Sequence, residues 1–170
     1  MWYAIRVTYG RELKFQDQLK KAGFETFVPM KQKKVEKDGK KFTVIVPAVS
    51  NLCFVNTEKA HLEGFMKELG EACPARFVWD KANARVAVIP DKAMNDFITV
   101  CRVMADEALY LKDISEKLRA GRKVRIKEGP FKGVEGVVVR VKKSRRVVVE
   151  LPGMLAVATT YIQPTDLELL

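Results

Sequence analysis

The chain has 170 residues and 48% are hydrophobic, which suits one domain or two small ones and excludes a disordered chain. A formal net charge of +10 points to an anionic partner such as nucleic acid, although surface lysines also serve solubility alone. Three widely spaced cysteines without a CxxC pair, and a single histidine, His61, argue against zinc and against catalysis, so we expect no metal, no cofactor and no enzyme.

The N-terminal stretch MWYAIRVTYGRELK has neither a long apolar leader nor a small-residue cleavage pattern. No apolar run elsewhere is long enough to cross a bilayer. We therefore expect a cytoplasmic protein.

Short strands and amphipathic helices alternate over the first hundred or so residues. β-Branched and aromatic residues predict strands over 2–8, 24–30, 42–47, 52–55, 75–79 and 85–89. Apolar spacing predicts helices over 11–21, 58–69 and 91–104, the second with Thr57 as its N-cap. This mixture predicts an α+β domain over 1–104, in which helices flank a mostly antiparallel sheet.

The stretch KQKKVEKDGKK, 31–41, places six lysines around Asp38-Gly39. An Asp-Gly pair between two extended runs indicates a tight hairpin turn. Because both arms are polar, we expect this hairpin to project from the domain.

The pattern changes after Val103. Mild helical spacing at Leu109, Leu111, Ile114 and Leu118 predicts a partly helical linker over 105–120. From Arg122 apolar residues alternate with basic ones, with turns at Gly129-Pro130 and at 143–145 and a bend between Gly133 and Gly136. Five short strands in 121–170 predict a small closed barrel, because closure removes exposed strand edges.

Two stretches carry a family resemblance. KVRIKEGPFKGVEGVVVRV, 123–141, resembles the KOW motif, and WYAIRVTYG, 2–10, resembles the start of the NusG N-terminal domain. A basic hairpin, a strand ending in Phe54-Val55, a VIP before the last helix and a linker follow in the family's order. The chain thus resembles a bacterial NusG-family transcription elongation or antitermination factor along nearly its whole length.

The resemblance implies that the N-terminal domain binds the clamp helices of RNA polymerase through an apolar depression and suppresses pausing. The matching positions are Tyr3, Ile5, Val49, Leu52 and Phe54. Ordinary core strands explain Ile5 and Phe54 equally well. Where the family reads Pro-Leu-Phe-Pro-Gly-Tyr-Val-Phe-Val, this chain reads PAVSNLCFV, so Asn51 replaces the glycine and Leu52 an exposed tyrosine. This departure favours a specialised paralogue.

The resemblance also implies nucleic-acid contacts. Arg11 and Lys14 open the first helix where family members touch non-template DNA, although a solvated helix face is an equally good explanation. Lysines of the hairpin would reach upstream DNA or the polymerase. These are Lys33, Lys34, Lys37 and Lys40. In the barrel, we expect nucleic-acid contacts from Lys142, Lys143, Arg145 and Arg146.

The KOW domain is implied to bind a second partner, which in the family is a small-subunit ribosomal protein, the Rho terminator or RNA. Phe131 and Gly133 match the family's contact turn, where Phe131 is expected to be exposed. We expect a monomer whose barrel forms constitutively. The alternative function is a KOW-type RNA-binding protein in ribosome assembly or translation.

Overall fold

The computed structural model describes residues 1–112 and 120–170. They form two compact units, Met1–Pro90 and Asp91–Leu170. The sequence instead predicts domains at 1–104 and 121–170 joined by a linker at 105–120, and that division stays a prediction. Ile114 and Leu118, part of the predicted helical spacing of the linker, lie outside the described residues.

The first unit is built on an antiparallel sheet with the strand order β2-β5-β1-β6, and β9 pairs beside β1. Its strands are β1 (Trp2–Val7), β2 (Glu25–Phe27), β5 (Leu52–Asn56), β6 (Ala75–Phe77) and β9 (Val88–Ile89). Two further short strands, β7 (Trp79–Asp80) and β8 (Arg85–Val86), pair with each other.

Two helices, α1 (Glu12–Lys21) and α2 (Lys59–Leu69), cover one face of this sheet, and a short 3-10 turn (Gly70–Ala72) follows α2. The core joins alternate residues of β1 to Phe15 of α1 and Leu62 of α2. Thr57 is not the N-cap of α2. Glu58 occupies that position without a side-chain capping bond, while the Thr57 hydroxyl lies 3.5 Å from Nδ1 of His61.

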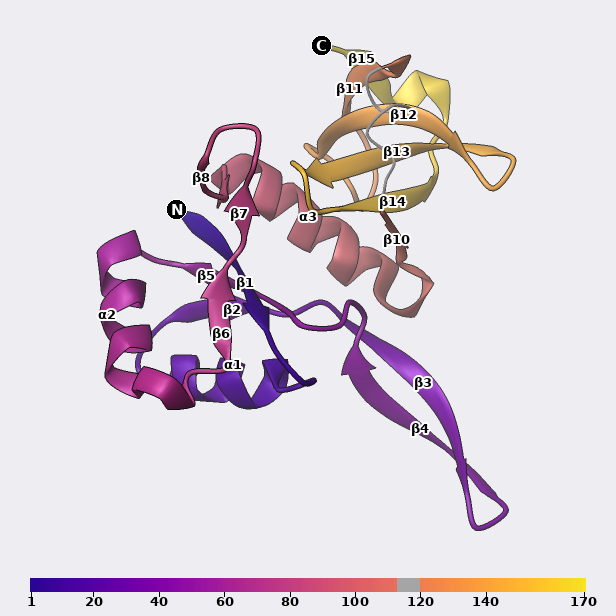
Figure 1. Cartoon of the computed structure of the whole chain (residues 1–170). Coiled ribbons are helices and arrows are strands. Elements are labelled where there is room, and N and C mark those ends of the chain that lie inside the picture. The colour runs from indigo at the N-terminus through magenta and orange to yellow at the C-terminus, as the bar shows by residue number, and fades with distance from the viewer. Residues whose placement is uncertain (113–119) are drawn as a thin grey trace. The chain divides into compact units, whose positions relative to one another are not determined.

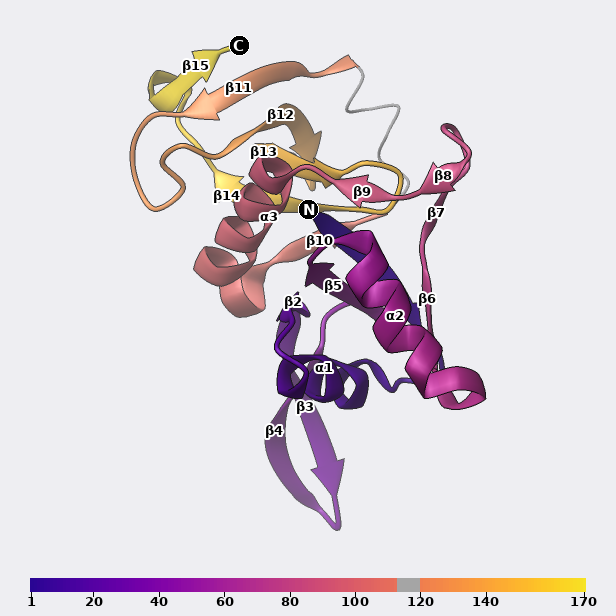
Figure 2. The same cartoon turned by 90° about the vertical axis from the view of Figure 1, so that its left-hand side faces the viewer.

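The lysine-rich segment forms the predicted hairpin. β3 (Met30–Lys37) and β4 (Lys40–Pro47) pair over their full length, and Asp38 and Gly39 turn the chain with φ of 52° and 73°. The hairpin extends away from the sheet and helices of its own unit (Figures 1 and 2).

The second unit contains helix α3 (Asp91–Met104), a 3-10 turn (Ala105–Glu107) and one six-stranded antiparallel sheet of order β10-β14-β13-β12-β11-β15. Its strands are β10 (Leu109–Leu111), β11 (Arg122–Ile126), β12 (Glu135–Val141), β13 (Ser144–Leu151), β14 (Leu155–Tyr161) and β15 (Leu167–Leu169), with a 3-10 turn at Pro164–Asp166. Among the described residues the edge strands β10 and β15 do not pair with each other, so the closed five-stranded barrel is not confirmed.

Strand β10, which is additional to the five strands predicted from the sequence, lies inside the segment predicted as a partly helical linker. Leu109–Leu111 pairs with Ala156–Ala158 of β14, and Leu109 and Leu111 pack against Val139 and Val148. Sheet pairing and burial in the folded unit therefore outweigh the weak helical spacing of this segment. Helix α3 packs on β13 and β14 of the same sheet.

Candidate nucleic-acid and partner interfaces

The hairpin β3–β4 has two chemically different faces. Paired residues of antiparallel strands share a face, and the face alternates along each strand. With Lys33 opposite Val44 and Lys37 opposite Lys40, one face, here called the basic face, has four lysines and no acid. It consists of Lys31, Lys33, Val35, Lys37, Lys40, Phe42, Val44 and Val46. The opposite face carries Lys34 and Lys41 beside Glu36. The predicted residues Lys34 and Lys33 therefore point to opposite sides.

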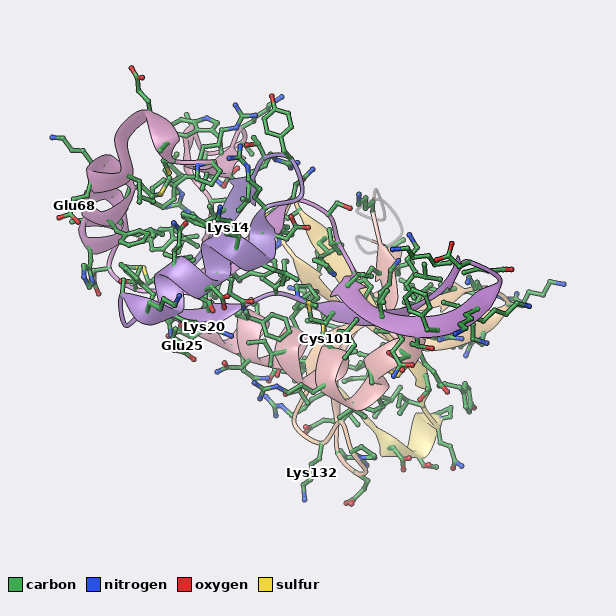
Figure 3. All side chains as sticks on the ribbon, turned by 90° about the horizontal axis from the view of Figure 1, so that it is seen from below. Lys14, Lys20, Glu25, Glu68, Cys101 and Lys132 are labelled. Carbon is green, nitrogen blue, oxygen red and sulfur yellow. The ribbon has the colours of Figure 1, made fainter. Side chains whose placement is uncertain are left out.

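The loop between β1 and α1 exposes an aromatic ring that the sequence reasoning missed. Tyr9 is 87% exposed with φ 57°, and the Arg11 guanidinium lies 5.5 Å from its ring centroid. The loop is tied to the chain before β5, because Oδ1 of Asn51 accepts the Gly10 N–H at 3.1 Å. Lys14 is exposed on α1 (Figure 3). The signal available in the sequence was Tyr9-Gly10, an aromatic residue inside a turn.

The five residues predicted for the polymerase site do not share one face. Register pairs Tyr3 with Val55 and Ile5 with Cys53, and all four belong to the core beneath α1 and α2. Phe54, paired with Ala4, and Leu52, paired with Arg6, point to the opposite face. Val49, Leu52 and Phe54 are buried, with exposures of 9%, 7% and 0%. Leu52 is therefore buried in this structure, although it stands at the position where the family is expected to have an exposed tyrosine.

The KOW turn also differs from expectation. Phe131 is only 5% exposed rather than held outward. Lys132, the next residue, points away from the ribbon instead (Figure 3). Phe131 lines a hollow together with Met104 at the end of α3. Gly133 adopts φ 87°, a conformation that favours glycine, and its carbonyl accepts a bond from Nζ of Lys92 at 2.9 Å.

A polar network joins α3 to β12. Oδ2 of Asp96, a nearly buried carboxylate, accepts bonds from Nζ of Lys92 at 2.5 Å and from the backbone N–H of Glu135 at 3.1 Å. The Glu135 carboxylate in turn accepts two bonds from Arg125, at 2.9 and 2.8 Å. These bonds hold the pKa of Glu135 below its ordinary value. Arg125 also donates to Glu168 at 3.3 Å, which extends the network to β15.

The turn between β12 and β13 carries the predicted basic cluster. Lys142 and Lys143 form the turn, one residue earlier than expected, because Ser144 already begins β13. Arg145 is exposed. Arg146 is not free, since Nε donates to the Ser144 hydroxyl at 3.1 Å and Nη1 donates to the Thr159 carbonyl at 3.0 Å. Arg146 thus has a structural role beside its predicted one.

Within 1–112 and 120–170 we find no group of three or more His, Cys, Asp or Glu side chains arranged to hold a metal ion. Burial raises the pKa of the Cys53 and Cys101 thiols to about 12, as expected for small core residues. In the same parts of the chain no helix is long and apolar enough to span a membrane.

Two family models match the chain. The model described as "Transcription termination factor nusG" matches residues 1–98, and the KOW motif model matches residues 120–150. The first match ends inside α3, and the second covers β11, β12 and most of β13. No curated protein matches the sequence.

Proposed function

The chain belongs to the NusG family of transcription factors, and we propose that it binds RNA polymerase during elongation and suppresses pausing or termination. The observation that carries the proposal is the order of parts: a NusG match on an α+β unit, followed by a KOW match on a β-rich unit.

For the polymerase contact we propose the sheet face that bears Leu52 and Phe54, with Val49 beside them. Tyr3 and Ile5 support this face from the opposite side of the sheet, because they pack beneath α1 and α2. This proposal retains three of the five predicted residues. Binding requires that Leu52 and Phe54, buried here, become accessible to the clamp helices.

For nucleic acid we propose two contacts in the N-terminal unit. The basic face of hairpin β3–β4 would meet phosphates of upstream DNA through charges that are independent of sequence. The β1–α1 loop and the first turn of α1 would meet non-template DNA, with Arg11 and Lys14 on phosphates and the exposed Tyr9 ring on a base.

For the KOW unit we propose a second partner: a small-subunit ribosomal protein, Rho or RNA. The turn at 129–133 is its contact, with Lys132 outward and Phe131 available once the hollow beside α3 opens. The basic β12–β13 turn favours an acidic or nucleic-acid partner.

The test is single-round transcription on a template with strong pauses, with and without the protein. We expect shorter pauses and co-purification of polymerase subunits from lysate. An unchanged pause pattern together with co-purification of ribosomes alone would replace this function by the translation-side alternative.

A matched pair of variants tests the contact face. Leu52→Ala and Leu62→Ala remove the same side chain from two buried positions, one in β5 and one in helix α2 over the opposite face of the sheet. Both lower stability, by about 2–5 kcal/mol. Only Leu52→Ala should also weaken binding to the clamp-helix coiled coil at a temperature where both variants are folded. An equal loss of binding affinity in both variants would show that Leu52 is not part of the interface.

A further inference from the structure

The β12–β13 turn holds two lysines in a backbone conformation that lysine rarely adopts. Lys142 has φ 46° and Lys143 has φ 69°. A two-residue hairpin turn with both φ values positive favours Asn-Gly or Asp-Gly, because a Cβ crowds the backbone there. The same chain uses Asp38-Gly39 for that purpose in hairpin β3–β4, with φ of 52° and 73°. Lysines at this turn therefore cost stability, which points to a use for their charge.

A small cavity is lined by Arg145, which follows this turn in β13. Its volume is about 130 Å³, and its apolar lining includes Val138, Val147 and Leu167. Tyr161 also lines it. Tyr161 is 56% exposed, so an aromatic surface is open to solvent at the cavity. The volume is somewhat below the about 150 Å³ of a cavity that binds one benzene molecule, so the cavity has the scale of a single ring.

The cations around the cavity divide into fixed and available ones. Arg146 is fixed by its bonds to Ser144 and Thr159. Lys142, Lys143 and Arg145 are exposed, and within the described part of the chain none of their side chains has a hydrogen bond or ion pair. Arg145 lines the cavity, and Lys142 and Lys143 lie in the turn two to three residues before it.

We propose that this turn and cavity bind single-stranded nucleic acid, with one unpaired base in the cavity against Tyr161 and backbone phosphates on Lys142, Lys143 and Arg145. Stacking on an aromatic ring beside a basic groove is how single strands are held without sequence preference. A duplex would meet the charges but has no free base for the cavity. The proposal deepens the nucleic-acid role given above to the KOW unit, and it does not require polymerase binding.

The first experiment measures binding of the full chain by fluorescence anisotropy. The probes are a short labelled RNA, a single-stranded DNA of the same sequence and the corresponding DNA duplex. We expect both single strands to bind more tightly than the duplex, and the RNA and DNA arms to show which strand is preferred. Tyr161→Ala should weaken single-strand binding about 5- to 150-fold. Trp79→Ala, which removes another exposed aromatic ring, should leave it unchanged. A Tyr161→Ala variant that binds like the parent overturns the proposal.

The second experiment separates charge from folding. The double variant Lys142→Asn, Lys143→Gly installs the favoured turn, so it should unfold at a higher temperature than the parent. It should nevertheless bind single strands more weakly, and the slope of log affinity against log salt should fall by roughly 0.7 for each lost phosphate contact. The control Lys20→Gln, Lys21→Gln removes the same charge from exposed positions of α1 and should keep the parent slope.

The outcomes distinguish this site from the wider function. Single-strand binding that survives both the turn variant and Tyr161→Ala overturns the site and leaves nucleic-acid binding to another surface. A full chain that binds no single strand overturns both the site and the nucleic-acid role of the KOW unit. Loss of the transcription effect alone overturns only the polymerase proposal.

Discussion

At the scale of single residues, we expect alanine substitutions at two glycines to change the stability of the protein in opposite directions. A Cβ added to Gly136 would lie 2.5 Å from the Val148 carbonyl oxygen and 2.8 Å from a Val147 methyl carbon. Gly136→Ala should therefore destabilise the protein by about 1–3 kcal/mol through overpacking. Gly64, inside α2, has open space around it, so Gly64→Ala should stabilise the protein by about 0.5–1 kcal/mol. Denaturant unfolding followed by circular dichroism measures both, and equal effects would contradict the contrast.

The three cysteines should differ in reactivity. Burial raises the pKa of Cys53 and Cys101 to about 12, so at pH near 8 almost none of either thiol is the reactive thiolate. Cys73 is only partly buried. We expect an alkylating reagent to modify Cys73 first, as one added mass per native chain, and the other two only after unfolding. Early modification of Cys53 would show that the core beneath α1 and α2 opens locally.

Some properties of single residues could be predicted from the sequence, and others could not. Asn51 occupies the position that the family fills with glycine, and it has φ 62°, a conformation that asparagine tolerates better than most residues. Backbone requirements of this kind follow from residue type. The burial of Leu52 and Phe131 could not be predicted from residue type, because the exposure of a side chain depends on neighbours that are distant in sequence.

At the scale of elements, the two faces of hairpin β3–β4 should differ in binding. Lys31→Gln, Lys33→Gln removes two charges from the basic face, whereas Lys34→Gln, Lys41→Gln removes two from the opposite face. If the basic face meets duplex phosphates, the first variant should lower the salt slope of DNA binding by roughly 0.9 for each lost contact, and the second should change it little. Titration at several salt concentrations gives both slopes. Equal slopes would mean that the hairpin binds DNA without a preferred face or not at all.

The attachment of α3 to the sheet should depend on Asp96. Asp96→Ala removes the acceptor of the Glu135 N–H and should cost about 1–3 kcal/mol, because that donor loses its partner in a partly buried place. Glu63→Ala breaks the exposed Lys59–Glu63 pair, whose side chains are 47% and 49% exposed, and should cost well under about 1 kcal/mol. Hydrogen exchange at the Glu135 amide provides the readout. Exchange as slow in Asp96→Ala as in the parent would contradict the assigned bond.

The same elements show why parts of the fold were predictable. The hairpin turn is signalled locally by Asp38-Gly39, and the valine alternation of β12 and β13 signals strands locally. β10 depends instead on a partner strand 45 to 49 residues further along the chain, with Leu109 opposite Ala158 and Leu111 opposite Ala156. Its own residues, with weak helical spacing, gave no sign of that partner. Long-range pairing of this kind is the part of the fold that local patterns miss.

At the scale of the whole molecule, the two ways of dividing the chain predict different fragments. In the structure α3 packs on β13 and β14, and β10 adds to β14. Leu109 and Leu111 pack on a cluster that contains Val139, Val141 and Val148. A fragment of residues 121–170 would expose this apolar cluster to water.

We therefore expect a fragment of residues 91–170 to unfold at a clearly higher denaturant concentration than a fragment of residues 121–170. The reason is apolar area: each Å² removed from water contributes about 25 cal/mol, and both α3 and β10 cover apolar surface of the sheet. Urea unfolding of both fragments measures the midpoints, and the larger fragment should also show the steeper transition because it exposes more surface. Asp96→Ala within the larger fragment is the control, since it should move the midpoint toward that of the smaller one. Identical midpoints would mean that α3 and β10 add nothing to the KOW sheet, and the boundary would return to the linker at 105–120.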